Sequence, residues 1–187
     1  TQIGYVPQDD IVHQQLTVEQ CMYFTAKIRL DNPLDSKIDK RINKILSDLD
    51  ISHVKHHLIS EISGGQKKRV SIAVELLVEP LILFLDEPTS PLDPENIYIL
   101  LTILKKLSDK GTTVVMVTHK PEDLEYMDEV IFMAGGEDIT CGNITYYGDS
   151  KKYKKYFKVD TAVAVFAQIS GKTANNWISK YLNPRPL

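Results

Sequence analysis

Apolar residues follow two patterns along this chain, short continuous blocks and a helical spacing of three or four residues. The blocks predict buried strands at 2–6, 81–85, 112–117, 129–134 and 143–148. The helical spacing predicts helices over 17–30, through 38–49, over 64–77 and over 93–110. Strands that alternate with helices indicate an α/β fold with a parallel sheet.

Local capping signals support the predicted helix starts. Thr17 is followed three residues later by Gln20, which is the capping-box pattern. Asp93 stands directly before Pro94, and an aspartate N-cap followed by proline is typical of a helix start. Gly111 follows the last apolar residue of that helix and predicts its end.

The segment from about residue 13 to 62 is nearly all helical in pattern, so we expect a helical subdomain inserted into the sheet domain. The predicted boundaries place the first strand and loop of the core at 1–12 and the helical subdomain at 13–80. The rest of the core is expected at 81–160, and a C-terminal extension at 161–187.

Composition narrows the class of protein. The 187 residues carry a formal net charge of −3, which gives no basic surplus for nucleic acid. Two distant cysteines, Cys21 and Cys141, indicate a reducing compartment without a disulfide framework. No apolar run approaches the ~20 residues that cross a bilayer. Because the chain opens on Thr1 without a methionine, we expect it to start inside a longer protein.

Polar side chains follow three of the predicted strands. Asp86 and Glu87 come at the end of the block 81–85, His119 follows 112–117, and Gln8 follows 2–6. Ligands of parallel sheets sit beyond the carboxyl ends of the strands. One carboxylate can bind Mg²⁺ through oxygen while the other takes a proton from water. A glutamine can orient water or ligate a metal through its carbonyl oxygen. A solvated acidic turn and an incidental surface histidine are the alternatives.

The stretch ISGGQKKRV, residues 62–70, combines two glycines with a basic helix start. Free N–H groups and the helix dipole make a helix N-terminus an anion site. Gly64 and Gly65 let the backbone approach a phosphate, and Ser63 adds a hydroxyl. A glycine turn capped by Ser63 is the alternative, but SGGQ before a basic helix favours phosphate.

These residues resemble the motifs of the ATP-binding cassette of ABC transporters. ISGGQ is similar to the family signature, usually LSGGQ, with Ile62 in place of leucine. FLDEPTSPLD at 84–93 resembles the Walker B strand, the catalytic glutamate and the D-loop. YVPQDD looks like the Q-loop and VTHKP like the switch histidine. KKRVSIAVELL and ITYYGDSKKYKKYF are similar to the G-type subfamily of pigment and lipid exporters.

The resemblance implies a P-loop NTPase-type parallel sheet, truncated on its N-terminal side, with the helical subdomain of ABC proteins. It also implies roles for the residues near the strand ends. Asp86 would hold Mg²⁺ through water, and Glu87 would polarise the attacking water. Gln8 and His119 would sense the γ-phosphate, with Gln8 also near the metal.

The signature residues have implied roles toward a second cassette. In a head-to-tail dimer they would close on the γ-phosphate of ATP bound to the partner, and Asp93 would communicate between the two sites. The residues are Ser63, Gly64, Gly65 and Gln66. The resemblance therefore implies ATP and Mg²⁺ as cofactors and a transmembrane domain as a further partner. The expected location is the cytoplasmic side of a membrane. A soluble ABC-type ATPase and a degenerate regulatory cassette remain alternatives.

The phosphate-binding loop GxxxxGK[ST] does not occur in the 187 residues. Gly171, Lys172 and Thr173 spell its end, but Phe166 stands where the pattern needs glycine. We therefore expect the chain alone neither to bind ATP tightly nor to hydrolyse it. The resemblance implies that the P-loop strand lies beside the strand of the switch histidine. Its absence should leave a gap between the strands at 112–117 and 129–134, unless these pair directly or a partner chain fills the slot.

Two further clusters have weaker signals. His53, His56 and His57 form a small cluster, in which His53 and His57 would share a face on a helix, and a solvated helix end is favoured over a metal site. KKYKKYF at 151–157 alternates basic and aromatic residues. An amphipathic helix that packs its tyrosines on the sheet is favoured there over nucleic-acid binding.

Overall fold

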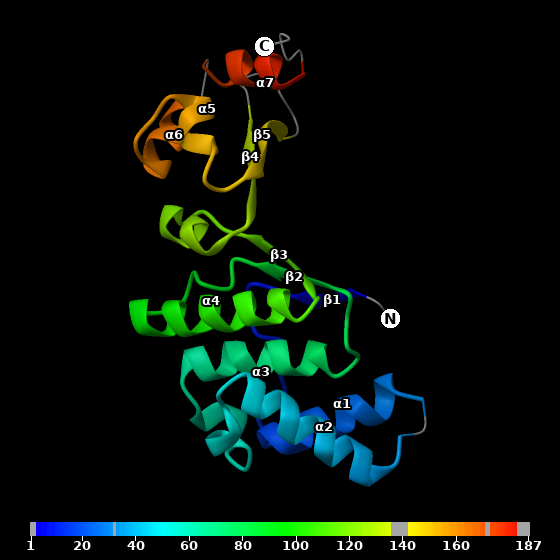
Figure 1. The fold of residues 1–187 in the computed structure, drawn as a ribbon. Coiled ribbons are helices and arrows are strands. Elements are labelled where there is room, and N and C mark those ends of the chain that lie inside the picture. Colours follow the sequence, from blue (N-terminus) through cyan, green and yellow to red (C-terminus); the bar gives the residue numbers. More distant parts are fainter. Residues whose placement is uncertain (1–2, 32, 136–141, 171–172, 183–187) are drawn as a thin grey trace. The chain divides into compact units, whose positions relative to one another are not determined.

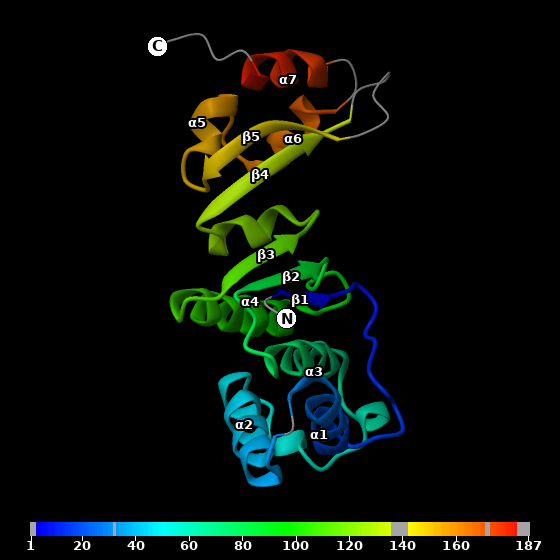
Figure 2. The ribbon, with the colours of Figure 1, turned by 90° about the vertical axis from the view of Figure 1, so that its right-hand side faces the viewer.

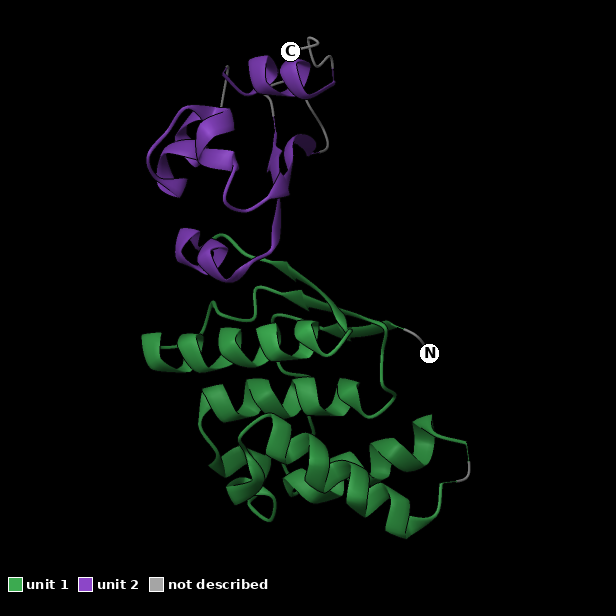
Figure 3. Cartoon of the chain, viewed as in Figure 1, with its two compact units in different colours: residues 1–119 green, residues 120–187 purple. Residues whose placement is uncertain are grey.

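The computed structural model describes residues 3–31, 33–135, 142–170 and 173–182. The chain divides into two compact units, Thr1–His119 and Lys120–Leu187, which Figure 3 colours separately. Each unit is described by itself below. The expected functional boundaries at 12, 80 and 160 stay a prediction, because compactness does not report which segments act together in catalysis.

Unit 1 is built on a three-stranded parallel sheet in the order β1-β2-β3. β1 is Ile3–Val6, β2 is Ile82–Asp86 and β3 is Thr113–Val117. Val6 pairs with Leu85, and Asp86 pairs with Val117, so the three strands end at nearly the same level. The parallel sheet expected from the sequence is confirmed.

The helices α1 to α4 of unit 1 all lie on the same side of this sheet, as Figures 1 and 2 show. α3 (Gly64–Leu76) and α4 (Pro94–Asp109) lie next to the strands, and α1 (Val18–Arg29) and α2 (Asp35–Asp48) lie beyond α3. Two 3₁₀ turns, η1 (Ser52–Val54) and η2 (Ile59–Glu61), connect α2 to α3. The predicted caps are confirmed: Thr17 and Gln20 form a capping box, and Asp93 caps α4.

α3 is the central helix of unit 1, because α1, α2, α4 and β1 all contact it. Its buried residues therefore include Lys68, Arg69 and Ser71 as well as Val70 and Ile72. The sequence had suggested a basic, amphipathic helix, in which charged residues lie on the polar face. That interpretation is wrong for Lys68 and Arg69, since a helix with neighbours on several sides has little solvent face.

Unit 2 contains a two-stranded antiparallel sheet covered by short helices. β4 (Glu129–Ala134) pairs with β5 (Asn143–Asp149), with an irregularity between Phe132 and Met133. The other elements are η3 (Pro121–Tyr126), α5 (Tyr153–Phe157), α6 (Ala162–Gln168) and α7 (Ala174–Leu182). The sequence placed the block 129–134 in the alternating parallel pattern, but it forms an antiparallel pair because the next strand follows it directly in the chain.

Aromatic rings fill the core of unit 2. Phe132 lies with its ring centroid 5.2 Å from Tyr153 and 5.5 Å from Phe157. Phe157 in turn lies 4.8 Å from Trp177. Tyr153 and Phe157 are the buried positions of α5, so the expected packing of KKYKKYF on a sheet is confirmed.

The described part of residues 160–187 is helical, and β3 and β4 belong to different sheets. The gap expected between these two strands stays a prediction, because they belong to different compact units. Gly171 and Lys172 lie outside the described residues. None of the helices in the described ranges is both long and apolar enough to span a bilayer.

Candidate functional site

The carboxyl ends of the three parallel strands bring four expected site residues to one edge of the sheet. Asp86 is the last residue of β2, and Glu87 follows it directly. Gln8 stands two residues after β1, and His119 stands two residues after β3. The in-register parallel pairing carries these side chains to the same level, as the sequence predicted.

Glu87 is the centre of this edge. Its Oε2 accepts a hydrogen bond from Nε2 of Gln8 at 3.3 Å. Its Oε1 lies 3.1 Å from Nδ1 of His119, which makes an ion pair when the imidazole is protonated. The Glu87 side chain is 28% exposed and that of His119 is 61% exposed, so water reaches the carboxylate. A carboxylate that is oriented by two neighbours and open to water has the arrangement of a general base.

The backbone of Glu87 has a left-handed conformation, with φ of 42°. This region costs a non-glycine residue on the order of 1–3 kcal/mol and is concentrated at functional sites. The amide of Glu87 donates to the carbonyl oxygen of Val117 at 3.0 Å, which fixes the turn against β3. The strain therefore places the side chain between Gln8 and His119.

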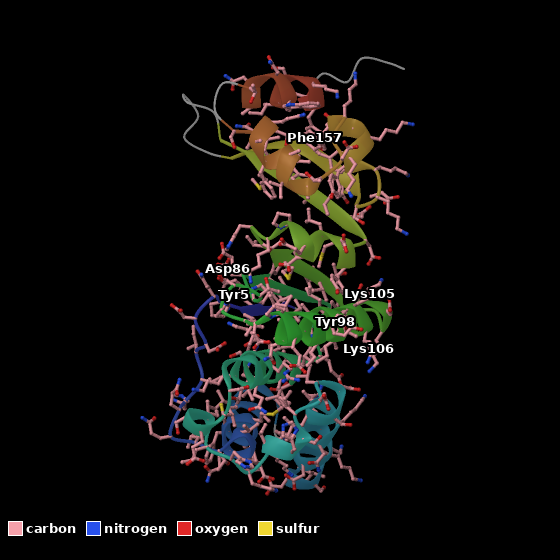
Figure 4. All side chains as sticks on the ribbon, turned by 90° about the vertical axis from the view of Figure 1, so that its left-hand side faces the viewer. Tyr5, Asp86, Tyr98, Lys105, Lys106 and Phe157 are labelled. Atoms are coloured by element: carbon pink, nitrogen blue, oxygen red, sulfur yellow. The ribbon has the colours of Figure 1, made fainter. Side chains whose placement is uncertain are left out.

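Asp86 has a different partner. Its Oδ2 accepts a weak hydrogen bond from the hydroxyl of Tyr5 at 3.5 Å. Figure 4 shows Tyr5 and Asp86 near each other at this edge of unit 1, away from Tyr98, Lys105 and Lys106 of α4. Sequence reasoning missed Tyr5, although the alternation of β1 places it on the face opposite Val6.

The oxygen atoms at this edge suit a hard cation. The carboxylate of Asp86 and the side-chain carbonyl of Gln8 are the kinds of ligand that Mg²⁺ takes. No group of three or more His, Cys, Asp or Glu side chains that could hold a metal occurs in the described ranges. Mg²⁺ is often held by one or two carboxylates together with substrate phosphates and water, so Asp86 with Gln8 is an adequate donor set for it.

The signature residues form the N-terminus of α3. Ser63 is the N-cap, and its Oγ accepts from the amide of Gln66 at 3.3 Å. The Oε1 of Gln66 accepts from the amide of Ser63 at 2.9 Å, which completes a capping box. The amides of Gly64 and Gly65 have no intrahelical partner, since they belong to the first turn. Gly64 is exposed whereas Gly65 is buried, so the amide of Gly64 is the donor that an anion would meet first.

The two glycines have different environments. A side chain on Gly64 would meet nothing within 4 Å, whereas a Cβ on Gly65 would lie 2.2 Å from Oδ1 of Asn96. Gly65 is therefore needed for packing against α4, and Gly64 is the glycine that leaves open space. The sequence had assigned both glycines to the approach of a phosphate.

Asn96 links the signature to the D-loop residue Asp93. The amide of Asn96 donates to Oδ1 of Asp93 at 3.0 Å, and its Nδ2 donates to Oδ2 at 2.7 Å. These hydrogen bonds lower the pKa of Asp93 below its ordinary value. The same side chain contacts Gly65. Sequence reasoning missed Asn96, whose signal is its place three residues after an aspartate N-cap.

The three histidines do not lie on one helix. η1 ends at Val54, and the carbonyls of Lys55 and His57 accept from the first amides of α1 instead. His53 contacts Gln66 of the signature at 3.1 Å, and Nδ1 of His56 lies 3.1 Å from Glu19. The expectation of a shared helical face is wrong, because pairing with α1 holds this segment in turns.

Comparison with known proteins places these motifs in a family. Residues 1–90 match the family model described as ABC transporter. The chain is 42% identical over 152 residues to the ABC transporter ATP-binding/permease protein Rv1747 of Mycobacterium tuberculosis. It is 40% identical over 164 residues to ABC transporter G family member 28 of Arabidopsis thaliana. These matches cover 79% and 83% of this chain, but only 17% and 14% of the relatives.

A solved structure agrees with the fold. The cbiO1 protein of Clostridium perfringens, part of the ABC transporter complex cbiONQ, matches with a TM-score of 0.69 and 28% identity. The match covers 90% of this chain and 62% of that one. The fold, the order of the motifs and the relatives agree: the chain belongs to the ABC transporter family and is part of its ATP-binding domain.

Proposed function

We propose that the protein containing this chain hydrolyses ATP and couples the hydrolysis to transport across a membrane. The observation that carries the proposal is Glu87, strained, open to water and held between Gln8 and His119. Phosphoryl transfer to water depends mainly on positioning and on stabilisation of charge. A fixed carboxylate at the carboxyl edge of the sheet supplies the positioning of the water.

Each residue at this edge has a different role in the proposed reaction. Glu87 accepts a hydrogen bond from the attacking water and so orients that water. Asp86 and the side-chain oxygen of Gln8 would hold Mg²⁺, which would supply positive charge to neutralise the phosphates. His119 contacts the γ-phosphate from the other side of Glu87 and reports whether it is present. The 3.1 Å contact between His119 and Glu87 supports this shared task.

The signature acts on the ATP of a second cassette in a head-to-tail dimer. Support comes from the exposed capped N-terminus of α3 and from the open space at Gly64. The bridge from Gly65 through Asn96 to Asp93 supports communication between the two halves. The partners proposed for this chain are a second cassette and a transmembrane domain on the cytoplasmic side of a membrane.

The test is ATP hydrolysis by the full-length protein in lipid vesicles, measured as phosphate release with and without Mg²⁺. Hydrolysis that requires Mg²⁺ and changes with the lipid environment supports the proposal. Binding of ATP without hydrolysis would instead support a degenerate regulatory cassette. Hydrolysis that is unaffected by removal of the membrane would support a soluble ABC-type ATPase.

A further inference from the structure

Lys68 is fully buried, which is rare for a lysine. Its side chain runs from α3 toward the segment after β1, where three oxygens surround the ammonium group. Nζ donates to the carbonyl oxygens of Gln8 at 2.8 Å and Pro7 at 3.3 Å. It also forms an ion pair with Oδ1 of Asp10 at 2.8 Å. An ammonium has three protons, so these three oxygens satisfy it completely.

A second side chain of α3 also contacts Asp10. The hydroxyl of Ser71 donates to its Oδ1 at 2.9 Å. Lys68 and Ser71 are three residues apart on α3, so both face the same segment. Four polar contacts therefore join one face of α3 to residues 7, 8 and 10. A buried ion pair gives little net stability compared with apolar packing, but its hydrogen bonds fix geometry.

The anchored segment leads directly to Glu87. Lys68 holds the backbone carbonyl of Gln8, and the side chain of the same residue donates to Glu87 at 3.3 Å. Glu87 then contacts His119 at 3.1 Å. Lys68 also stands one helical turn after Gly64, so it belongs to the same rigid helix as the signature. One buried side chain thus connects the signature helix to the backbone that aims Gln8.

We propose that Lys68 is a positioning residue for hydrolysis at Glu87. Its ammonium fixes the backbone of Pro7 and Gln8 to α3, so that the Gln8 side chain stays against Glu87. A shift of α3 at the signature then moves Gln8 with it. This inference rests on the proposed function of Glu87, and it adds a residue that does not itself contact ATP, metal or water.

The first test is kinetic and uses the full-length protein. Lys68→Met keeps the length of the side chain but donates no hydrogen bond. We expect kcat to fall about 10- to 100-fold, the size of effect that a misplacement of about 1 Å produces. KM for ATP should change much less than kcat, since Lys68 itself is not a binding group. Lys106→Met, which removes an exposed lysine from α4, is the matched control and should leave both constants unchanged.

A double-mutant cycle separates positioning from general damage to the fold. If Lys68 acts through Gln8, Lys68→Met should cause little further loss of kcat in a Gln8→Ala background. Losses that multiply in the double variant would overturn the proposal, and so would an unchanged kcat in Lys68→Met. If Lys68→Met does not fold, Lys68→Met with Asp10→Asn removes the unpaired carboxylate and enters the same cycle.

A spin label at residue 11 tests the anchor without any activity. Ile11 is 82% exposed, follows Asp10, and can be replaced by a labelled cysteine after the other cysteines of the protein, Cys21 and Cys141 among them, are changed to serine. We expect the label to be more mobile in Lys68→Met than in the wild type or in Lys106→Met. Equal mobility in all three would reject the anchor. A wild type that does not hydrolyse ATP would reject only the proposed function, because this measurement still tests Lys68.

Discussion

Each compact unit has its own apolar core, but the contacts that accompany the two cores differ. In unit 1, directional polar contacts join distant parts of the chain, such as Gln8 to Glu87 and Lys68 to Asp10. In unit 2, the core consists of rings that pack on one another around Phe132 and Phe157. Hydrogen bonds fix atoms to a few tenths of an ångström, whereas apolar packing fixes mainly volume.

This difference matches where the proposed chemistry lies. Every residue proposed for catalysis, metal binding or the signature lies at or before His119, inside unit 1. Polar contacts there have a cost in desolvation that is tolerated where positions must be held to within a fraction of an ångström. Unit 2 uses burial of aromatic surface, which stabilises without orienting a reacting group. The following predictions test this division, starting with the largest expected effect.

Glu87→Gln in the full-length protein should abolish most hydrolysis. The amide keeps the shape of the side chain but cannot act as a base, so the rate should fall about 10²- to 10⁴-fold. ATP binding should persist, because no phosphate contact is removed. Phosphate release and nucleotide binding should be measured in parallel, with Glu125→Gln in unit 2 as the matched control. A rate near that of the wild type would exclude Glu87 as the base.

Phe157→Ala should affect stability rather than chemistry. Phe157 is 1% exposed and contacts Phe132 and Trp177, so its loss should lower the free energy of unfolding by about 3–5 kcal/mol. Trp177 is the only tryptophan in the sequence, so its fluorescence reports unit 2 during denaturation. Circular dichroism reports both units, and the helices of unit 1 should unfold at an unchanged denaturant concentration. A parallel shift of both signals would show that the units unfold together.

Gly65→Ala and Gly64→Ala should differ although the residues are neighbours. The methyl group that alanine adds at position 65 would collide with Asn96, which Asp93 holds in place, so stability should fall by about 1–3 kcal/mol. At position 64 the methyl group meets open space, and stability should change by less than about 1 kcal/mol. Denaturation midpoints measure both. Asn96→Ala should restore part of the loss in Gly65→Ala, and no restoration would contradict the assigned contact.

Asp93→Asn should remove a small dependence of stability on pH. The amide of Asn96 lowers the pKa of Asp93 in the folded protein below its ordinary value of 3.8. The contribution of the Asp93 carboxylate to the free energy of unfolding is therefore present above pH 3.8. It is lost as the pH falls through the lower pKa of the folded protein. Asparagine also caps helices, so the fold should persist. The free energy of unfolding, measured from pH 5 to pH 2, should fall less steeply with acid in the variant than in the wild type. The same dependence on pH in both proteins would count against this assignment.

The smallest expected signal is the binding of Mg-ATP to the 187-residue chain itself. A helix N-terminus contributes about 0.3–2 kcal/mol toward an anion, whereas micromolar affinity needs about 8 kcal/mol. The loop that supplies the rest in P-loop enzymes does not occur in the sequence. Isothermal titration should give no micromolar site, and one such site per chain would refute this expectation.

Several features were determined by the sequence alone, because their causes lie within a few residues. The caps at Thr17, Ser63 and Asp93 depend on atoms three residues away, and those at Thr17 and Asp93 formed as expected. Each strand of the parallel sheet ends within one residue of its apolar block, which brought Asp86, Glu87 and His119 to one edge. The order of the motifs was sufficient to indicate the family.

Other features were decided only by the tertiary structure, because they join residues far apart in the chain. Gln8 and Glu87 are 79 positions apart, and Lys68 and Gln8 are 60 apart, so no local pattern could reveal either contact. The burial of Lys68 requires α3 to have neighbours on several sides, and the packing of Gly65 requires the approach of Asn96 from another helix. Local hydrogen bonding fixes where an element starts, whereas packing decides which of its faces remains for a ligand.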